Sequence, residues 1–95
     1  MALAELDVEV GRVVYTSILD QHGGFKADLT IMRLGDNFFR IVTGGMDGPR
    51  DRKWFEDHLP ADGSAALDDV TSAWCTLGLW GPRARDILEA TTSAD

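Results

Sequence analysis

Residues 12–43 read RVVYTSILDQHGGFKADLTIMRLGDNFFRIVT, and this stretch decides the fold. Two runs rich in β-branched and aromatic residues, 12–19 and 25–34, are typical of strands. Between them lies Asp20-Gln21-His22-Gly23-Gly24, whose paired glycines supply the backbone angles that a tight connection needs. A third strand-like run at 38–43 follows a second short turn. The stretch therefore predicts an antiparallel three-stranded meander.

Alternation along the second strand predicts which residues share a face, because successive side chains of a strand point to opposite sides. One face carries Phe25, Ala27, Leu29 and Ile31, and the other carries Lys26, Asp28, Thr30 and Met32. Asp28 stands out, since aspartate is poorly suited to strand interiors. Two interpretations are open. The carboxylate faces solvent from a half-exposed sheet, which is the commoner case, or it is held on a rigid strand to bind an amine and remove its proton.

The chain after the meander predicts two helices separated by short strands. The first helix is expected to begin at Pro49, with Asp47 as its cap, because proline suits the first helical turn. Its apolar stripe is formed by Trp54, Phe55, His58 and Leu59. Short strands are predicted at 67–71 and 73–80. Strands, helix, strands and a final helix make an α+β pattern.

The final helix is expected to start after Gly81-Pro82. Ile87 and Leu88 are predicted to face inward, while Arg85 and Glu89 are spaced for an exposed ion pair.

Composition indicates a soluble globular chain, either one small domain or a piece of a larger one. It has 95 residues, of which 44% are hydrophobic and 26% charged. A net charge of -7 disfavours nucleic acid, whose affinity comes mainly from phosphate neutralisation, and an anionic membrane surface. No signal peptide and no apolar stretch near the ~20 residues of a membrane helix is present. One cysteine allows no internal disulfide, so a cytoplasmic location is expected.

A search for common catalytic motifs is mostly empty. His22 and His58 have no cysteine or acidic residue at ligand spacing, so no metal site is predicted. Cys75 lies in an apolar run and is expected to be a buried, inert thiol. Trp74 and Trp80 could offer flat surface to a ligand, but core packing is the stronger interpretation.

Three separated blocks, in the same order along the chain, resemble the T-protein (aminomethyltransferase) family. In that family a Tyr-Thr strand leads to a Leu-Asn turn, a Gly-Gly pair and an Asp-Leu strand, which residues 11–30 resemble. Residues 69–72 resemble its Asp-Val-Ser/Thr segment, and residues 77–85 its Leu-Gly-Pro-x-Ala/Ser-Arg segment. The amino-acid sequence of these blocks is closer to the folate domains of dimethylglycine and sarcosine dehydrogenases than to the stand-alone glycine-cleavage protein.

The resemblance implies a domain that binds tetrahydrofolate and transfers to it a one-carbon unit from an aminomethyl or iminium donor. Asp28 falls on the family's catalytic carboxylate, and Tyr15 on a tyrosine that lines the folate pocket. Thr43 falls where many members have an asparagine that contacts the pterin. Two further departures are Asp20, in place of an asparagine, and Ala27, in place of the first of two aspartates of the glycine-cleavage branch.

The resemblance covers residues 11–95 and implies part of a larger domain, with residues 1–10 as a tail or the end of a preceding element. It implies tetrahydrofolate as cofactor, with FAD only in a separate domain of the parent, if one is attached. Expected partners are tetrahydrofolate, the amine-derived donor and the rest of the parent enzyme. The chain alone is expected to be inactive and to self-associate weakly. The alternative is a non-catalytic folate-binding or structural module with the same fold.

Overall fold

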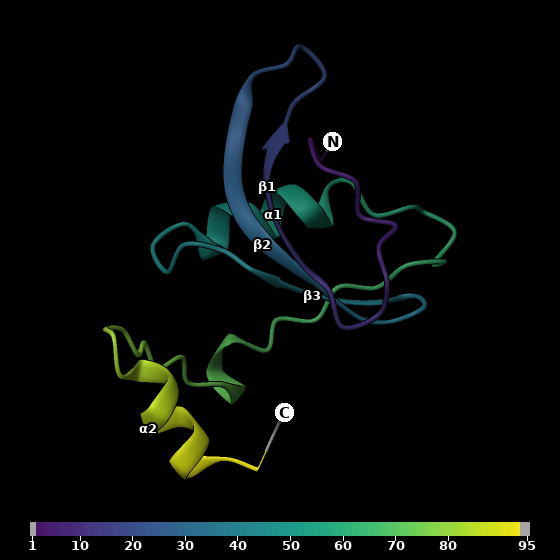
Figure 1. The fold of residues 1–95 in the computed structure, drawn as a ribbon. Coiled ribbons are helices and arrows are strands. Elements are labelled where there is room, and N and C mark those ends of the chain that lie inside the picture. The colour runs from purple at the N-terminus through teal and green to yellow at the C-terminus, as the bar shows by residue number, and fades with distance from the viewer. Residues whose placement is uncertain (1, 94–95) are drawn as a thin grey trace.

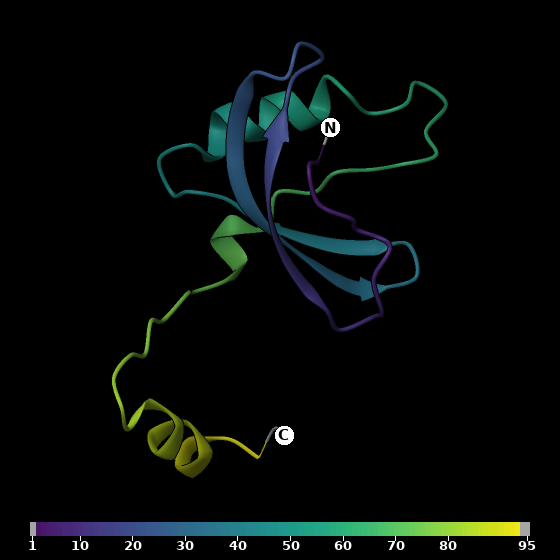
Figure 2. The same cartoon turned by 45° about the horizontal axis from the view of Figure 1, so that its top comes forward.

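The computed structural model describes residues 2–93 and has an α+β fold (Figure 1). A three-stranded sheet and one helix form its folded body, and an extended arm, residues 74–93, leads away from it (Figures 1 and 2). In chain order the elements are β1 (Val13–Leu19), β2 (Phe25–Gly35), β3 (Phe38–Val42), α1 (Gly48–Glu56), the 3-10 turn η1 (Thr71–Ala73) and α2 (Ala84–Thr91).

The sheet is the predicted antiparallel meander, with strand order β1-β2-β3. Ile18 pairs with Ala27, and the next pair joins Leu19 to Phe25, so Lys26 is the extra residue of a β-bulge. The bulge breaks the alternation at this end of β2. Phe25 was predicted to share the face of Leu29, but it is exposed.

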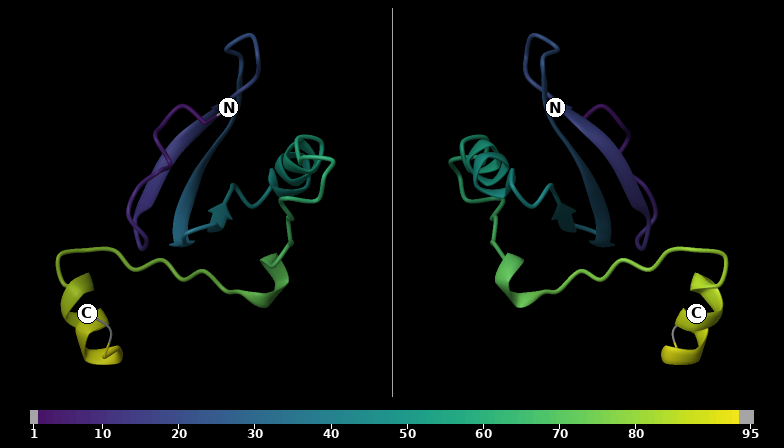
Figure 3. Two further views of the ribbon diagram at one scale, coloured as in Figure 1. Left: turned by 90° about the vertical axis from the view of Figure 1, so that its right-hand side faces the viewer. Right: turned by 90° about the vertical axis from the view of Figure 1, so that its left-hand side faces the viewer.

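The core lies on the face of the sheet that α1 covers (Figure 3). Its buried apolar residues come from alternate positions on β1 and β2: Ile18, Ala27, Leu29 and Ile31. Trp54 and Phe55 of α1 pack against them, as the predicted apolar stripe requires. Burying one leucine or isoleucine side chain contributes about 1.5–3 kcal/mol, so this small cluster carries much of the stability of the folded body.

The segment before β1 runs along the outer edge of that strand. Ala2 forms an antiparallel bridge with Ile18, and the Leu3 amide donates to the Ser17 carbonyl at 3.0 Å. The Ala4 amide donates to Thr16 Oγ1, also at 3.0 Å. These contacts pair part of an edge that would otherwise present unsatisfied backbone groups.

Helix α1 forms where it was predicted, but both ends differ from expectation. Asp47 occupies the N-cap position, yet its side chain makes no capping hydrogen bond and instead pairs with Arg50 at 3.2 Å. The helix ends at Glu56, and the His58 ring stacks on Trp54 with the ring centroids 4.1 Å apart. His58 Nδ1 also lies 2.7 Å from the Trp54 carbonyl oxygen. The predicted apolar stripe therefore extends from α1 into the turn that follows it.

The predicted strands at 67–71 and 73–80 are wrong. Their place is taken by η1 and by extended chain that pairs with no strand in residues 2–93. A strand needs a neighbour to satisfy its backbone groups, and the arm runs clear of the sheet (Figure 2).

Helix α2 confirms the predicted helix and its Arg85–Glu89 ion pair at 2.7 Å. The inward direction predicted for Ile87 and Leu88 is wrong, because α2 stands apart from the sheet and both side chains are exposed (Figure 3). Within residues 2–93, no helix has the length and apolar character needed to cross a membrane.

The arm overturns two further expectations. Cys75, predicted to be buried, is exposed. Trp74 and Trp80, predicted to be core residues, are exposed as well. The burial predicted for the apolar run of the arm is therefore wrong.

Leu29→Ala tests the position of the core. Leu29 is 2% exposed at the centre of the cluster, so truncation leaves a cavity and should lower the free energy of unfolding by about 2–5 kcal/mol. Leu77→Ala is the matched control, because Leu77 is 87% exposed on the arm and its loss should change stability by no more than about 0.5 kcal/mol. Urea denaturation of both variants measures this, and equal losses would contradict the assigned core.

Candidate functional site

The face of the sheet turned away from α1 carries a different set of side chains from the core face. We call it the open face. The register places Tyr15 opposite Thr30, Ser17 opposite Asp28 and Met32 opposite Arg40, so these residues share one side. Its exposed members include Tyr15, whose surface is 69% accessible, and Asp28. Polar and aromatic groups on a rigid, accessible sheet make this face the candidate site.

Tyr15 and Asp28 meet on the open face. Ser17 is the direct cross-strand partner of Asp28, and Tyr15, two positions along β1, reaches Asp28 diagonally. The Tyr15 hydroxyl donates a hydrogen bond to Asp28 Oδ2. The prediction that these residues share a face across the first hairpin is therefore confirmed.

The Tyr15–Asp28 pair has an electrostatic consequence. The hydrogen bond to Asp28, followed by the negative charge of that carboxylate, raises the pKa of the Tyr15 hydroxyl above its usual value. Tyr15 thus keeps its proton and acts as a fixed donor at neutral pH. Within the described chain, Asp28 Oδ1 has no hydrogen-bond partner, so one oxygen of the carboxylate is available to a ligand. A fixed carboxylate with a free oxygen can bind a cationic amine and accept its proton.

Arg40 adds a positive charge to the open face. It lies on β3 opposite Met32, and its guanidinium carbon sits 4.2 Å from the centre of the Trp74 ring. Stacking on an aromatic ring restrains the guanidinium while leaving its donors free. Of the two tryptophans considered as flat surfaces, Trp74 thus lies near the open face.

Thr43 takes a different direction from the other two predicted site residues. It follows Val42, which pairs with Thr30 on the open face, so alternation turns Thr43 toward α1. Its hydroxyl donates to Asp51 Oδ2 in the first turn of that helix. The structure therefore brings Tyr15 and Asp28 together, while the hydroxyl of Thr43 is engaged on the other side of the sheet.

The two departures from the family pattern in the first hairpin lie away from the Tyr15–Asp28 pair. Asp20 Oδ1 accepts the amide protons of His22 at 2.9 Å and Gly24 at 2.8 Å, which lowers the pKa of the Asp20 carboxyl. An asparagine oxygen accepts the same bonds, so Asp20 serves the turn. Ala27 is buried in the core opposite Ile18. Neither departure removes a group from the open face.

Sequence reasoning missed Asp51. This aspartate is only 4% exposed, and besides the Thr43 hydroxyl it accepts hydrogen bonds from Arg50 Nε at 3.1 Å and Nη2 at 3.0 Å. An aspartate in the first turn of a helix is common, because it complements the helix dipole. That local signal does not reveal burial, which depends on β3 lying beside α1.

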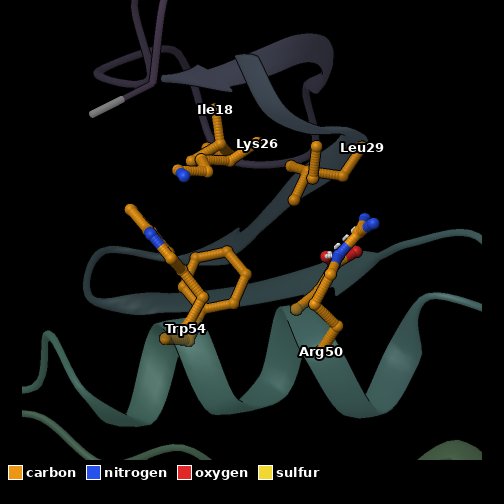
Figure 4. Close-up of a pocket in the computed structure, with 8 residues that line it drawn as sticks. Ile18, Lys26, Leu29, Arg50 and Trp54 are labelled. Carbon is orange, nitrogen blue, oxygen red and sulfur yellow. Dashed lines mark hydrogen bonds and ion pairs between the residues drawn. The ribbon is translucent and has the colours of Figure 1, made fainter. Parts of the chain in front are cut away.

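A cavity lies between the core face and α1, where Ile18, Leu29, Trp54 and Arg50 point toward one another (Figure 4). Its volume is about 60 Å³, and a water molecule requires about 10–15 Å³ on the same measure. The cavity therefore has room for a few water molecules and is too small for a pterin ring.

Comparisons with known proteins identify the family of this chain. The family model described as the GCVT N-terminal domain matches residues 1–95. The chain belongs to the GCVT N-terminal domain family. Relatives in this family include an aminomethyltransferase of Geobacillus thermodenitrificans, 34% identical over 85 residues, which covers 90% of this chain and 23% of the relative.

Two other relatives are much longer proteins. The 4-methylaminobutanoate oxidase (formaldehyde-forming) of Paenarthrobacter nicotinovorans is 33% identical over 99% of this chain and 11% of its own length. The mitochondrial pyruvate dehydrogenase phosphatase regulatory subunit of Mus musculus is 36% identical over 95% of this chain and 10% of its own length. The chain thus spans a tenth to a quarter of these curated relatives. No solved structure matches it significantly.

Titration of Tyr15 tests the pair directly, because Tyr15 is the only tyrosine and its ultraviolet absorbance reports it alone. The midpoint in the folded chain should lie above the ordinary value of 10.0, and Asp28→Asn should bring it down, because the variant removes the carboxylate charge. Asp36→Asn, an exposed change in the second turn, should leave the midpoint in place.

The raised pKa also predicts how stability depends on pH. A group whose pKa is raised by folding contributes stability below its unfolded pKa, and this stability is lost as pH rises through the folded pKa. The free energy of unfolding should therefore fall above pH 10.0 more steeply in the wild type than in Asp28→Asn. Identical midpoints of the Tyr15 titration in the wild type and in Asp28→Asn would contradict the Tyr15–Asp28 pair.

Proposed function

We propose that the chain is part of a tetrahydrofolate-binding domain that transfers a one-carbon unit from an amine, with Asp28 as the acid–base group. The observation that carries the proposal is the Tyr15–Asp28 pair on the open face of a sheet in a member of this family. The carboxylate sits at the position that the family resemblance implies, and it has a fixed donor on one oxygen and free space at the other.

Tetrahydrofolate supplies the nucleophilic amine of this reaction, and the donor is an aminomethyl or iminium carbon. The role of Asp28 is to stabilise the positive charge that develops on the amine and to accept its proton. Tyr15 holds the carboxylate in one orientation through its hydroxyl. Its exposed ring also offers a flat surface on which a pterin or benzoyl ring can stack.

Arg40 and Thr43 complete the proposed folate contacts. The guanidinium of Arg40 lies on the same face as Asp28 and attracts the anionic tail of the ligand. Thr43 occupies the position of a pterin-contacting residue. Because its side chain faces α1 and gives its hydroxyl proton to Asp51, Thr43 offers its backbone to a ligand on the open face.

The proposal places the reaction in a larger protein. A folate pocket buries most of its ligand, whereas the open face contacts a ligand from one side only. The remaining walls are proposed to come from the rest of the parent enzyme, in line with the small share of each relative that this chain covers. Any flavin belongs to a separate domain, because the chain has no glycine-rich dinucleotide fingerprint.

The alternative function is a non-catalytic module of the same fold. One observation favours it: a relative 36% identical to this chain is named as a regulatory subunit of a phosphatase. The two functions differ in their dependence on Asp28. A binding module needs the shape of the open face, whereas a transferase also needs a proton acceptor there.

Asp28→Asn in the parent enzyme separates the two functions. The amide keeps the shape and a hydrogen-bond acceptor but cannot take a proton, so one-carbon transfer should fall by roughly 10²–10⁴-fold while folding is unchanged. Rapid-quench assays with tetrahydrofolate and the amine donor measure the rate. Asp36→Asn is the matched control and should retain the wild-type rate. A wild-type rate in Asp28→Asn would sink the catalytic assignment.

Calorimetry tests the proposed incompleteness of the pocket. The 95-residue chain should bind tetrahydrofolate weakly or not at all, because the open face leaves one side of the ligand in water. The parent enzyme is the positive control and should saturate. Tight, stoichiometric binding by the isolated chain would show that the open face alone is a complete site.

A further inference from the structure

Asp51 is a buried carboxylate that ties β3 to α1. It accepts hydrogen bonds from Thr43, at the end of β3, and from Arg50, its neighbour on the helix. A buried charge is costly unless it is paired and hydrogen-bonded, and these partners meet that requirement. The contact with Thr43 joins two segments separated by a loop, so it fixes where that loop begins and where it ends.

The loop between these contacts, residues 44–47, is held in a compact form. The Asp47 amide donates to the Gly44 carbonyl at 2.9 Å, which closes a turn. Arg50 links Asp47 to Asp51, because its Nη1 lies 3.2 Å from Asp47 Oδ1 while its Nη2 contacts Asp51. Together, Thr43, Asp47, Arg50 and Asp51 form what we call the loop clamp. Gly44 fits closely inside it, since a Cβ there would lie 3.0 Å from Asp47 Oδ2.

The register carries this loop toward the candidate site. Val42, the last residue of β3, pairs with Thr30, and Asp28 lies two residues further along β2 in the direction in which β3 ends. The 44–47 loop therefore begins at the end of β3 that is nearer to Asp28, while Tyr15 contacts Asp28 from the β1 side.

We propose that Asp51 is a positioning residue for folate binding. Through Thr43 and Arg50 it fixes the 44–47 loop at the end of β3 nearer to Asp28 and so sets the affinity for tetrahydrofolate without touching the ligand. The Thr43 hydroxyl acts through Asp51 and is not a folate ligand. This inference rests on the proposed function and deepens it, because it assigns control of the folate pocket to a carboxylate on the opposite side of the sheet.

The test compares Asp51→Leu, Thr43→Val and the double variant in the parent enzyme, with steady-state kinetics in tetrahydrofolate. Each single variant should raise KM for tetrahydrofolate by roughly tenfold with kcat little changed, because misplacing a binding group by about 1 Å has large effects. The double variant should be no worse than Asp51→Leu, since the leucine already removes the contact that Thr43→Val breaks. Thr43→Ser keeps the hydroxyl and should restore a KM close to the wild type.

Glu56→Gln is the matched control. It also removes a carboxylate from α1, but Glu56 is exposed and its carboxylate pairs with Arg52 at 2.7 Å, so KM should be unchanged. Thermal unfolding of every variant accompanies the kinetics. A role confined to stability would lower the melting temperature of Asp51→Leu and leave KM alone, and this result would overturn the inference. Thr43→Val supplies the same test if Asp51→Leu does not fold.

The remaining outcomes separate the inference from the function on which it rests. A raised KM in Thr43→Val with a normal KM in Asp51→Leu would make Thr43 a direct ligand and overturn the positioning role. Additive effects in the double variant would do the same. If Asp28→Asn abolishes transfer while both clamp variants keep the wild-type KM, the proposed function stands and this inference fails. If the parent enzyme shows no saturation with tetrahydrofolate, both fail.

Discussion

The pairing register of β1 and β2 is the constraint on which the rest of the structure depends. It sets Ile18 opposite Ala27 and Ser17 opposite Asp28, which assigns each residue of the hairpin to one of two faces. A slip by one residue would turn Asp28 into the core and Leu29 out to water. The burial of Leu29 therefore opposes any register in which the carboxylate is hidden, and the core holds Asp28 where it is accessible.

The meander could be predicted from sequence because its signals are local. Alternation and the Gly23-Gly24 pair act between near neighbours, and Gly23 adopts a φ of +81°, which glycine tolerates at no steric cost. The segment from Leu67 to Trp80 has similar strand propensity, but propensity alone does not supply a partner for its backbone. In the structure this segment forms η1 and unpaired chain, which shows that β character is realised only where a second strand is present.

One part of the candidate site, the Tyr15–Asp28 pair, could also be predicted from sequence. Tyr15 and Asp28 are close because of the local hairpin register, so sequence and family resemblance together could place them. Asp51 could not be found this way. Its burial arises from contact between the end of β3 and the first turn of α1, and no periodicity in the chain encodes that contact. The direction of Thr43 follows from alternation after Val42, but its partner does not.

The two faces of the sheet differ in their exposure to water. The core face excludes it, and there Asp51 is stable only because donors surround it. The open face admits water, which weakens every charge interaction of Asp28, since two charges interact several times more strongly in a partly shielded site than in bulk solvent. A carboxylate that stabilises a developing cation gains most when water is displaced around it. The Tyr15 hydroxyl can orient Asp28 with or without water around it, but it cannot exclude water from the site. The proposed chemistry therefore requires a surface that closes over the open face and displaces water from around Asp28.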